Sequence, residues 1–267
     1  MEDLPLLVAK DYRAPSLFEP TNLLREARRL RGLPDVVVPA VCLLDPDGDI
    51  VRHLTDTGRG RPHPGWACFH TRMWTVDLDG IEVGVVGLAV GAPFAVLVAE
   101  QLAASGCELL VSVTSAGRIS PLAEPPYFVL IDRALRDEGT SLHYLPPARW
   151  SLLNPALAER LTDAFGHLPE PVLTGPSWTT DAPYRETAAA IAAAEVERIA
   201  CVEMEAAALY AYAAATGAAV VCLAHITNTM AGEGEDAERG RDFEKGRDNG
   251  VYDALAVTRA VAAALRG

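Results

Sequence analysis

Apolar residues in this chain occur in short continuous runs that alternate with longer segments rich in alanine and leucine. Continuous apolar runs without alternating polar positions are typical of strands that are buried on both faces of a sheet. They predict strands at residues 36–44, 73–78, 81–88, 108–114, 127–132 and 218–226. The alanine-rich segments predict helices at residues 94–104, 155–164, 185–200, 205–215 and 252–265.

This alternation predicts an α/β fold with a central mixed, largely parallel sheet flanked by helices, and with ligands at the carboxyl ends of the strands. A length of 267 residues without an internal repeat or low-complexity linker fits a single domain. Residues 1–267 are therefore treated as one domain, in which residues 1–35 form an atypical N-terminal extension. Two polar segments, residues 55–65 and 232–249, are predicted to be loops or a lid over the site.

Composition narrows the class of partner. The net charge of -13 argues against a nucleic-acid partner, because binding to a phosphate backbone needs a basic surface. No apolar run reaches the length of a membrane span, and the acidic start of the chain is unlike a signal peptide, so we expect a cytoplasmic protein without a membrane partner. The five cysteines are scattered without metal-ligand spacing and are expected to be reduced.

The segment around Glu203, Met204 and Glu205 carries the clearest chemical signal, since two carboxylates flank a methionine just before an alanine-rich helix. A carboxylate accepts hydrogen bonds from sugar hydroxyls, and a methionine offers an apolar wall to the carbon face of a ribose. The alternative is structural, because acidic residues are also favoured at the positive end of a helix dipole.

Six short motifs resemble, in the same order, those of the nucleoside phosphorylase superfamily of the uridine phosphorylase and bacterial purine nucleoside phosphorylase type, which also contains nucleosidases. They are residues 87–93, 113–117, 136–141, 179–181, 203–205 and 226–228. The resemblance implies an enzyme that cleaves the N-glycosidic bond of a ribonucleoside with inorganic phosphate, giving free base and ribose 1-phosphate. No metal or organic cofactor is implied.

For the sugar, the resemblance implies that Glu205 is catalytic. It would bind the ribose hydroxyls and favour the positive charge that develops on the sugar as the base leaves. Met204 would pack against the ribose. Glu203 either contacts the ribose as well or serves as a helix cap.

For the base, the resemblance places the loop with Thr180 and Asp181 against the ring, and Asn228 at its hydrogen-bonding edge as a second catalytic candidate. An amide both donates and accepts hydrogen bonds but cannot act as a general acid. Because relatives that cleave uridine carry asparagine at this place, a uridine-like substrate is preferred.

The aromatic residue that relatives place after the loop aspartate is replaced here by Pro183. Tyr184 or Trp178 would have to take over its stacking role. Arg185 could bond a pyrimidine carbonyl, or it could be a surface residue at a helix start.

For the phosphate, the resemblance implies Ser115 and Gly117, with Thr114 in the same motif. Ser112 stands where phosphorylases of this type carry an arginine. Arg118, or Arg72, could compensate for this loss, and both could also be ordinary surface residues.

Two other functions stay open. A nucleosidase of the same superfamily would use water, and the turn with Asp45 and Asp47 after the first predicted strand is its only candidate base. A sensor would bind nucleosides without cleaving them. For any of these functions the resemblance implies a homo-oligomer, either a dimer or a hexamer.

Overall fold

The computed structural model describes residues 5–229 and 250–266, with the side chains of residues 227–229 left outside this description. The predicted loop at 232–249 therefore also lies outside the described residues. The strands are β1 (Val41–Asp45), β2 (Arg61–Pro62), β3 (Met73–Leu78), β4 (Ile81–Gly87), β5 (Leu109–Arg118), β6 (Tyr127–Asp137), β7 (Trp150–Leu152), β8 (Val172–Thr180), β9 (Cys201–Glu203) and β10 (Ala219–Thr229).

The α-helices of the described part are α1 (Pro20–Arg31), α2 (Asp49–Asp56), α3 (Ala92–Ala104), α4 (Ser141–Tyr144), α5 (Pro155–Arg160), α6 (Ala188–Val196), α7 (Ala206–Thr216) and α9 (Val251–Arg266). Short 3-10 helices are η1 (Pro5–Leu7) and η2 (Pro183–Arg185). None of these helices is long and apolar enough to cross a membrane.

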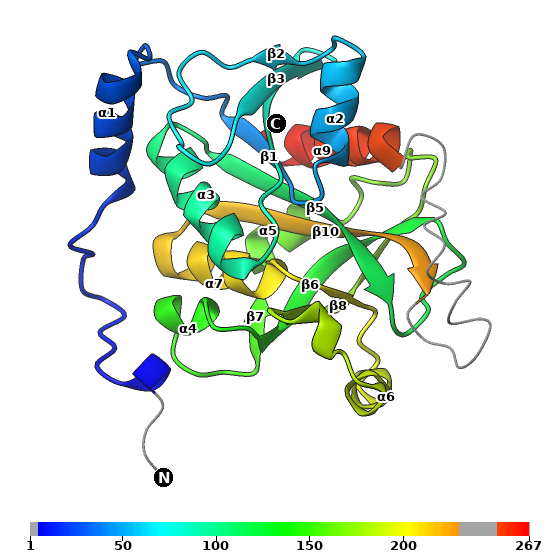
Figure 1. Cartoon of the computed structure of the whole chain (residues 1–267). Helices are drawn as coiled ribbons and strands as arrows, with labels where there is room; N and C mark the ends of the chain where they lie inside the picture. Colours follow the sequence, from blue (N-terminus) through cyan, green and yellow to red (C-terminus); the bar gives the residue numbers. More distant parts are fainter. Residues whose placement is uncertain (1–4, 230–249, 267) are drawn as a thin grey trace.

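The strands form one mixed sheet that closes on itself (Figure 1). Along the order β10-β6-β8-β9-β5, each strand pairs with the next, and β5 also pairs with β10 to complete the ring. From β5 the sheet continues outward through β1, β4, β3 and β2. The long strand β5 makes this closure possible, since its first residues pair with β1 and its last two, Gly117 and Arg118, pair with β9.

The α/β class and the mixed sheet are confirmed, but the expectation of a largely parallel sheet is wrong. Parallel pairs join β5 to β1 and β10, β1 to β4, and β8 to β6 and β9. Equally many pairs are antiparallel, namely β6 with β10 and β7, β3 with β2 and β4, and β5 with β9. The reason is that ring closure and the hairpins return the chain in both directions, which the apolar runs alone do not encode.

Most predicted elements are present with shifted ends. The first strand begins at Val41 instead of residue 36, after Pro39, which has no backbone N–H to donate to a sheet. The predicted helix at 185–200 contracts to α6, and the one at 155–164 contracts to α5. Strand β8 was not predicted, because Pro176 and several polar residues interrupt its pattern.

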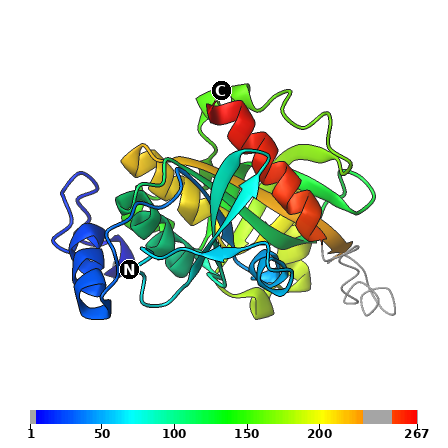
Figure 2. The same ribbon diagram turned by 90° about the horizontal axis from the view of Figure 1, so that it is seen from above.

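The helices flank the sheet on different sides, as Figures 1 and 2 show for α1 and α9. Helix α3 packs against both α7 and α1, whereas α9 packs against α2 and α5. In the N-terminal extension, Leu24 and Ala27 of α1 are buried with Ala67 in a small cluster. The extension is thus packed onto the body of the fold through α1.

Candidate active site

The segment that follows β9 forms a tight turn into α7, and Glu203 holds this turn together. One oxygen of its carboxylate accepts hydrogen bonds from the backbone N–H groups of Glu205 and Ala206, each at 2.7 Å. The other accepts from the hydroxyls of Ser177, at 3.0 Å, and Thr179 on the neighbouring strand β8. Four donors engage the Glu203 side chain, so its observed role is to cap α7 and position the turn.

Glu205 is placed differently, although it is only two residues away. Its side chain is 2% exposed, and one oxygen, Oε1, accepts a hydrogen bond from the N–H of Gly91 at 2.7 Å. The other oxygen, Oε2, is buried and has no hydrogen-bond partner among the described residues. Burial, together with the negative charges of Glu203 and Asp47, raises the pKa of Glu205 to about 8.

Gly91 belongs to the motif at residues 87–93, but the sequence did not predict its contact with Glu205. It is the N-cap residue of α3 and has a φ of 90°, a backbone conformation that favours glycine. The glycine-rich run that ends in Gly91 before a predicted helix was the available signal, because such runs let a backbone N–H approach a partner closely.

Asp47 connects this carboxylate pair to the end of β5. Its Oδ2 accepts a hydrogen bond from the backbone N–H of Ser115 at 2.7 Å. The charges of Asp47 and Glu203 both raise the pKa of Glu205, so these three carboxylates lie close enough to interact. The backbone N–H of Ser115, one of the predicted phosphate residues, is thus engaged by a carboxylate of the same chain.

The turn that carries Asp47 is fixed by Asp45, the last residue of β1. The Asp45 carboxylate accepts hydrogen bonds from the N–H groups of Gly48, at 3.1 Å, and Val51, at 2.9 Å. Burial raises the pKa of Asp45 to about 7. This turn is therefore more than an ordinary surface turn, because Asp45 fixes its backbone and Asp47 bonds to Ser115.

A small cavity of ≈ 30 Å³ lies at this edge of the sheet. Thr114 and Ser115 line it from β5, and His225 lines it from β10. Thr114 is buried, and its hydroxyl donates to the backbone carbonyl of Ser115 at 3.3 Å. Two of the predicted phosphate residues, Thr114 and Ser115, thus lie beside the aspartate turn, and Gly117 follows on the same strand, paired with Val202.

Arg118 points elsewhere. Its guanidinium donates to the carbonyl of Ala123 at 3.3 Å and lies 3.9 Å from the carboxylate of Glu124. Among the described residues, no arginine or lysine pairs with Asp47 or Glu205. The predicted role of Arg118 in phosphate binding therefore gains no support from its contacts.

The predicted base loop follows β8, the strand whose Thr179 hydroxyl donates to Glu203. Thr180 is buried and its hydroxyl accepts a hydrogen bond from the N–H of Ala182 at 3.1 Å. Asp181 accepts a hydrogen bond from the N–H of Gly139 at 2.9 Å. Tyr184 and Arg185 lie in the 3-10 helix η2, where Tyr184 is 99% exposed and Arg185 is also exposed.

Trp178 and Asn228 are the two further base candidates. Trp178 is buried, and its ring N–H donates to Asp137 at 2.9 Å, while its stacking role stays a prediction. Asn228 pairs with Gly117 through the backbone of β10, and its side chain lies outside the described residues. Its predicted contact with the base stays a prediction.

No group of three or more His, Cys, Asp or Glu side chains in the described ranges is arranged to hold a metal ion.

A family model described as the phosphorylase superfamily matches residues 45–263. The chain belongs to the phosphorylase superfamily. The resemblance inferred from six short motifs is thereby confirmed, and the superfamily match includes every residue of the site described above.

Relatives within the superfamily differ in the base that their names give. Guanosine phosphorylase of Halorubrum lacusprofundi is 28% identical over 195 residues, which cover 70% of this chain and 78% of that protein. Uridine phosphorylase of Thermococcus kodakarensis is 32% identical over 74 residues, or 28% of this chain and 27% of that protein. These names leave the base preference of this chain open.

Solved structures support the fold of the superfamily. Purine nucleoside phosphorylase of Toxoplasma gondii, in complex with immucillin-H, matches with a TM-score of 0.72 at 15% identity, covering 95% of this chain and 98% of that one. Uridine phosphorylase of Vibrio fischeri, complexed with 6-hydroxy-1-naphthoic acid, matches with a TM-score of 0.69 at 18% identity, covering 86% and 93%. At such identities the likeness shows a shared fold.

Proposed function

We propose that this protein cleaves the N-glycosidic bond of a ribonucleoside and releases the free base. The observation that carries the proposal is the buried carboxylate oxygen Oε2 of Glu205, which has no hydrogen-bond partner among the described residues. A buried polar atom without a partner costs free energy, and a ligand that donates a hydrogen bond recovers it. The 2′ and 3′ hydroxyls of a ribose are such donors, and Met204 beside Glu205 would pack against the sugar.

The raised pKa of Glu205 suits this role. Without substrate, the nearby charges of Glu203 and Asp47 disfavour the ionised form. Hydroxyl donors and a positively charged sugar both favour the ionised form, so the pKa falls as the reaction proceeds. Glu205 therefore interacts more strongly with the transition state than with the free nucleoside, which is what lowers a barrier.

For the nucleophile, the contact between Asp47 and the Ser115 N–H favours water. It places a carboxylate beside Ser115, one of the predicted phosphate residues, and a carboxylate repels a phosphate anion. In this reaction a water oxygen bonds to C1′ while the C1′–N bond breaks. The bonding pair leaves with the base, and the proton of the water passes to Asp47.

Phosphate is the second candidate, and the phosphorylase names of the two relatives favour it. Thr114, Ser115 and Gly117 would supply its donors, with cationic ligands such as Arg118 or Arg72 rearranged or supplied by a neighbouring subunit. The product would then be ribose 1-phosphate, with inorganic phosphate as co-substrate. This version goes together with the proposal that the protein is a homo-oligomer, a dimer or hexamer, acting in the cytoplasm.

The preference for a uridine-like base is likewise a proposal. It rests on Asn228 at the expected base edge, with Thr180, Asp181, Tyr184 and Arg185 as further base contacts. The test is a panel of nucleosides incubated with and without phosphate, with the base and the sugar product identified. Free ribose formed equally well without phosphate would establish hydrolysis, and ribose 1-phosphate would establish phosphorolysis. Binding without release of any base would overturn catalysis and leave a nucleoside sensor.

A further inference from the structure

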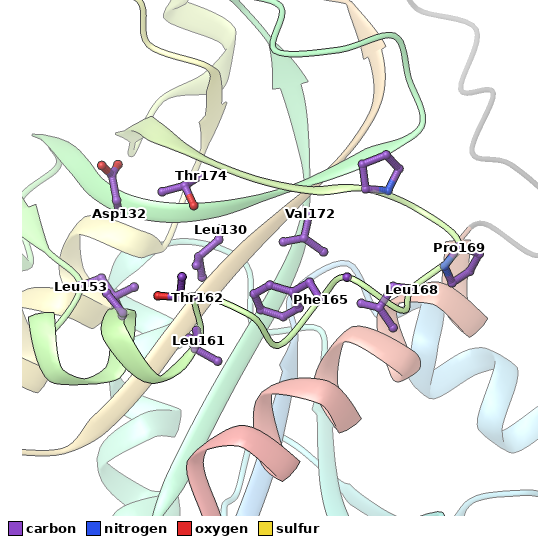
Figure 3. A pocket seen from close by; sticks show the side chains of 13 residues that line it. Leu130, Asp132, Leu153, Leu161, Thr162, Phe165, Leu168, Pro169, Val172 and Thr174 are labelled. Carbon is purple, nitrogen blue, oxygen red and sulfur yellow. The ribbon is translucent and has the colours of Figure 1, made fainter.

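A second cavity, of ≈ 560 Å³, lies away from the candidate active site, between the sheet and the segment that begins with α5 (Figure 3). One wall is formed by β6 and β8, where Leu130 and Thr174 are paired across the two strands. The other wall is formed by Ala158 of α5 and by the following loop. The volume lies within the range of ordinary small-molecule sites.

The lining of this cavity is apolar at one end and polar at the other. Figure 3 shows Asp132 at one end and Phe165, Leu168 and Pro169 extending toward the other. Asp132 and Leu130, both on β6, line the cavity together. A ligand that fits both ends has a polar head and an apolar body.

One oxygen of the Asp132 carboxylate lacks a hydrogen-bond partner among the described residues. This oxygen, Oδ1, is buried. Two arginines of the lining elements are engaged elsewhere, since Arg133 lies over the ring of Trp150 and Arg160 donates to the carbonyl of Ala264 at 2.9 Å. A buried carboxylate oxygen is costly unless it is hydrogen-bonded, and an ammonium group supplies both a donor and the opposite charge.

We propose that this cavity is a binding site for a small amphipathic amine, whose ammonium group bonds to Asp132 and whose apolar body lies against Phe165 and Leu168. The site shares no lining residue with the small cavity beside Ser115 and Asp47. The proposal does not depend on which reaction the protein catalyses.

The test is calorimetric titration of the full-length protein with n-hexylammonium, with hexan-1-ol and hexanoate as probes of the same apolar body. We expect saturable binding of hexylammonium at one site, weaker binding of hexanol and none of hexanoate. Asp132→Asn should weaken hexylammonium binding about ten-fold or more, because it removes a charged hydrogen-bond acceptor. Ala158→Phe should block the site by filling it.

Asp163→Asn is the matched control, because Asp163 is an exposed carboxylate of the same loop that does not line the cavity. It makes the same change of charge and should leave hexylammonium binding unchanged. Equal affinities for hexylammonium and hexanol, equal affinities of wild type and Asp132→Asn, or no saturable binding would each overturn the proposal. Thermal unfolding of each variant establishes that it is folded before it is titrated.

Discussion

The proposed sugar end and the proposed base end of the candidate site are built in contrasting ways. At the sugar end, Glu203 accepts four hydrogen bonds and Glu205 is buried against Gly91, so the carboxylates are fixed before any substrate binds. At the base end, Tyr184 is 99% exposed and Asp181 is bonded to Gly139. One end is preorganised within this chain, and the other is open.

This difference follows from where the residues lie in the fold. The sugar end is formed where β1 and β9 pair with β5, and this backbone pairing fixes its geometry. The base end lies on the 3-10 helix η2, beyond the last residue of β8, where no sheet partner constrains it. Rigid elements suit the stabilisation of charge, which needs fixed geometry, whereas recognition of a base tolerates adjustment.

The largest expected effect comes from the preorganised end. Glu205→Gln keeps the shape of the side chain but removes the charge that would stabilise the positive sugar. Base release should fall by about 100- to 1,000-fold in kcat/KM, as for the loss of a preorganised electrostatic group. Glu195→Gln, an exposed change on α6, is the control and should retain wild-type rates. Turnover of Glu205→Gln close to that of wild type would refute the assignment of the sugar end.

Asp47→Asn distinguishes water from phosphate as the nucleophile. The amide oxygen of asparagine still accepts the hydrogen bond from Ser115, so the turn is retained, but the amide cannot take a proton from water. In phosphate-free buffer we expect base release to fall about 100-fold, as for the loss of a general base. Asp56→Asn, an exposed change nearby, should be neutral. Activity that rises with phosphate in Asp47→Asn would instead favour phosphate as the nucleophile.

Glu203→Ala tests the scaffold of the sugar end. It leaves two backbone N–H groups and the hydroxyls of Ser177 and Thr179 without their acceptor inside the protein. We expect the free energy of unfolding to fall on the order of 3 kcal/mol, measured by urea denaturation. Glu195→Ala on the exposed face of α6 should change it by less than about 0.5 kcal/mol. Similar values for the two variants would show that the turn is held by other contacts.

The raised pKa of Glu205 predicts how stability depends on pH. Folding holds the proton on Glu205 up to a pKa of about 8, whereas the unfolded chain releases it near 4.5. The folded state therefore binds more protons between these values, and its stability falls as the pH rises through this window. The free energies of unfolding of wild type and Glu205→Gln, compared at pH 5 and pH 8.5, should show a steeper fall in wild type. Parallel profiles would contradict a buried, protonated Glu205.

Local motifs in the sequence encode the turn of the proposed sugar end. The turn at Glu205 and the glycine run before α3 could be recognised from neighbouring residues alone. The contact between Asp47 and Ser115 joins positions 68 residues apart, and it depends on the strand pairing that brings β1 beside β5. Likewise, β8 helps to close the ring although it contains Pro176, and the local pattern of apolar residues does not predict that closure.

Tyr184→Ala should have the smallest effect and probes the open end directly. Because the side chain is almost fully exposed, its removal should change the free energy of unfolding by less than about 0.5 kcal/mol. If Tyr184 stacks on the base, KM for the nucleoside should rise a few-fold with kcat little changed, since stacking holds substrate and transition state alike. Val196→Ala, an equally exposed apolar truncation at the end of α6, is the matched control. A Tyr184→Ala variant with the KM and kcat of wild type would show that Tyr184 does not contact the base. Other residues would then recognise the base, and the exposed segment at η2 would be ordinary protein surface.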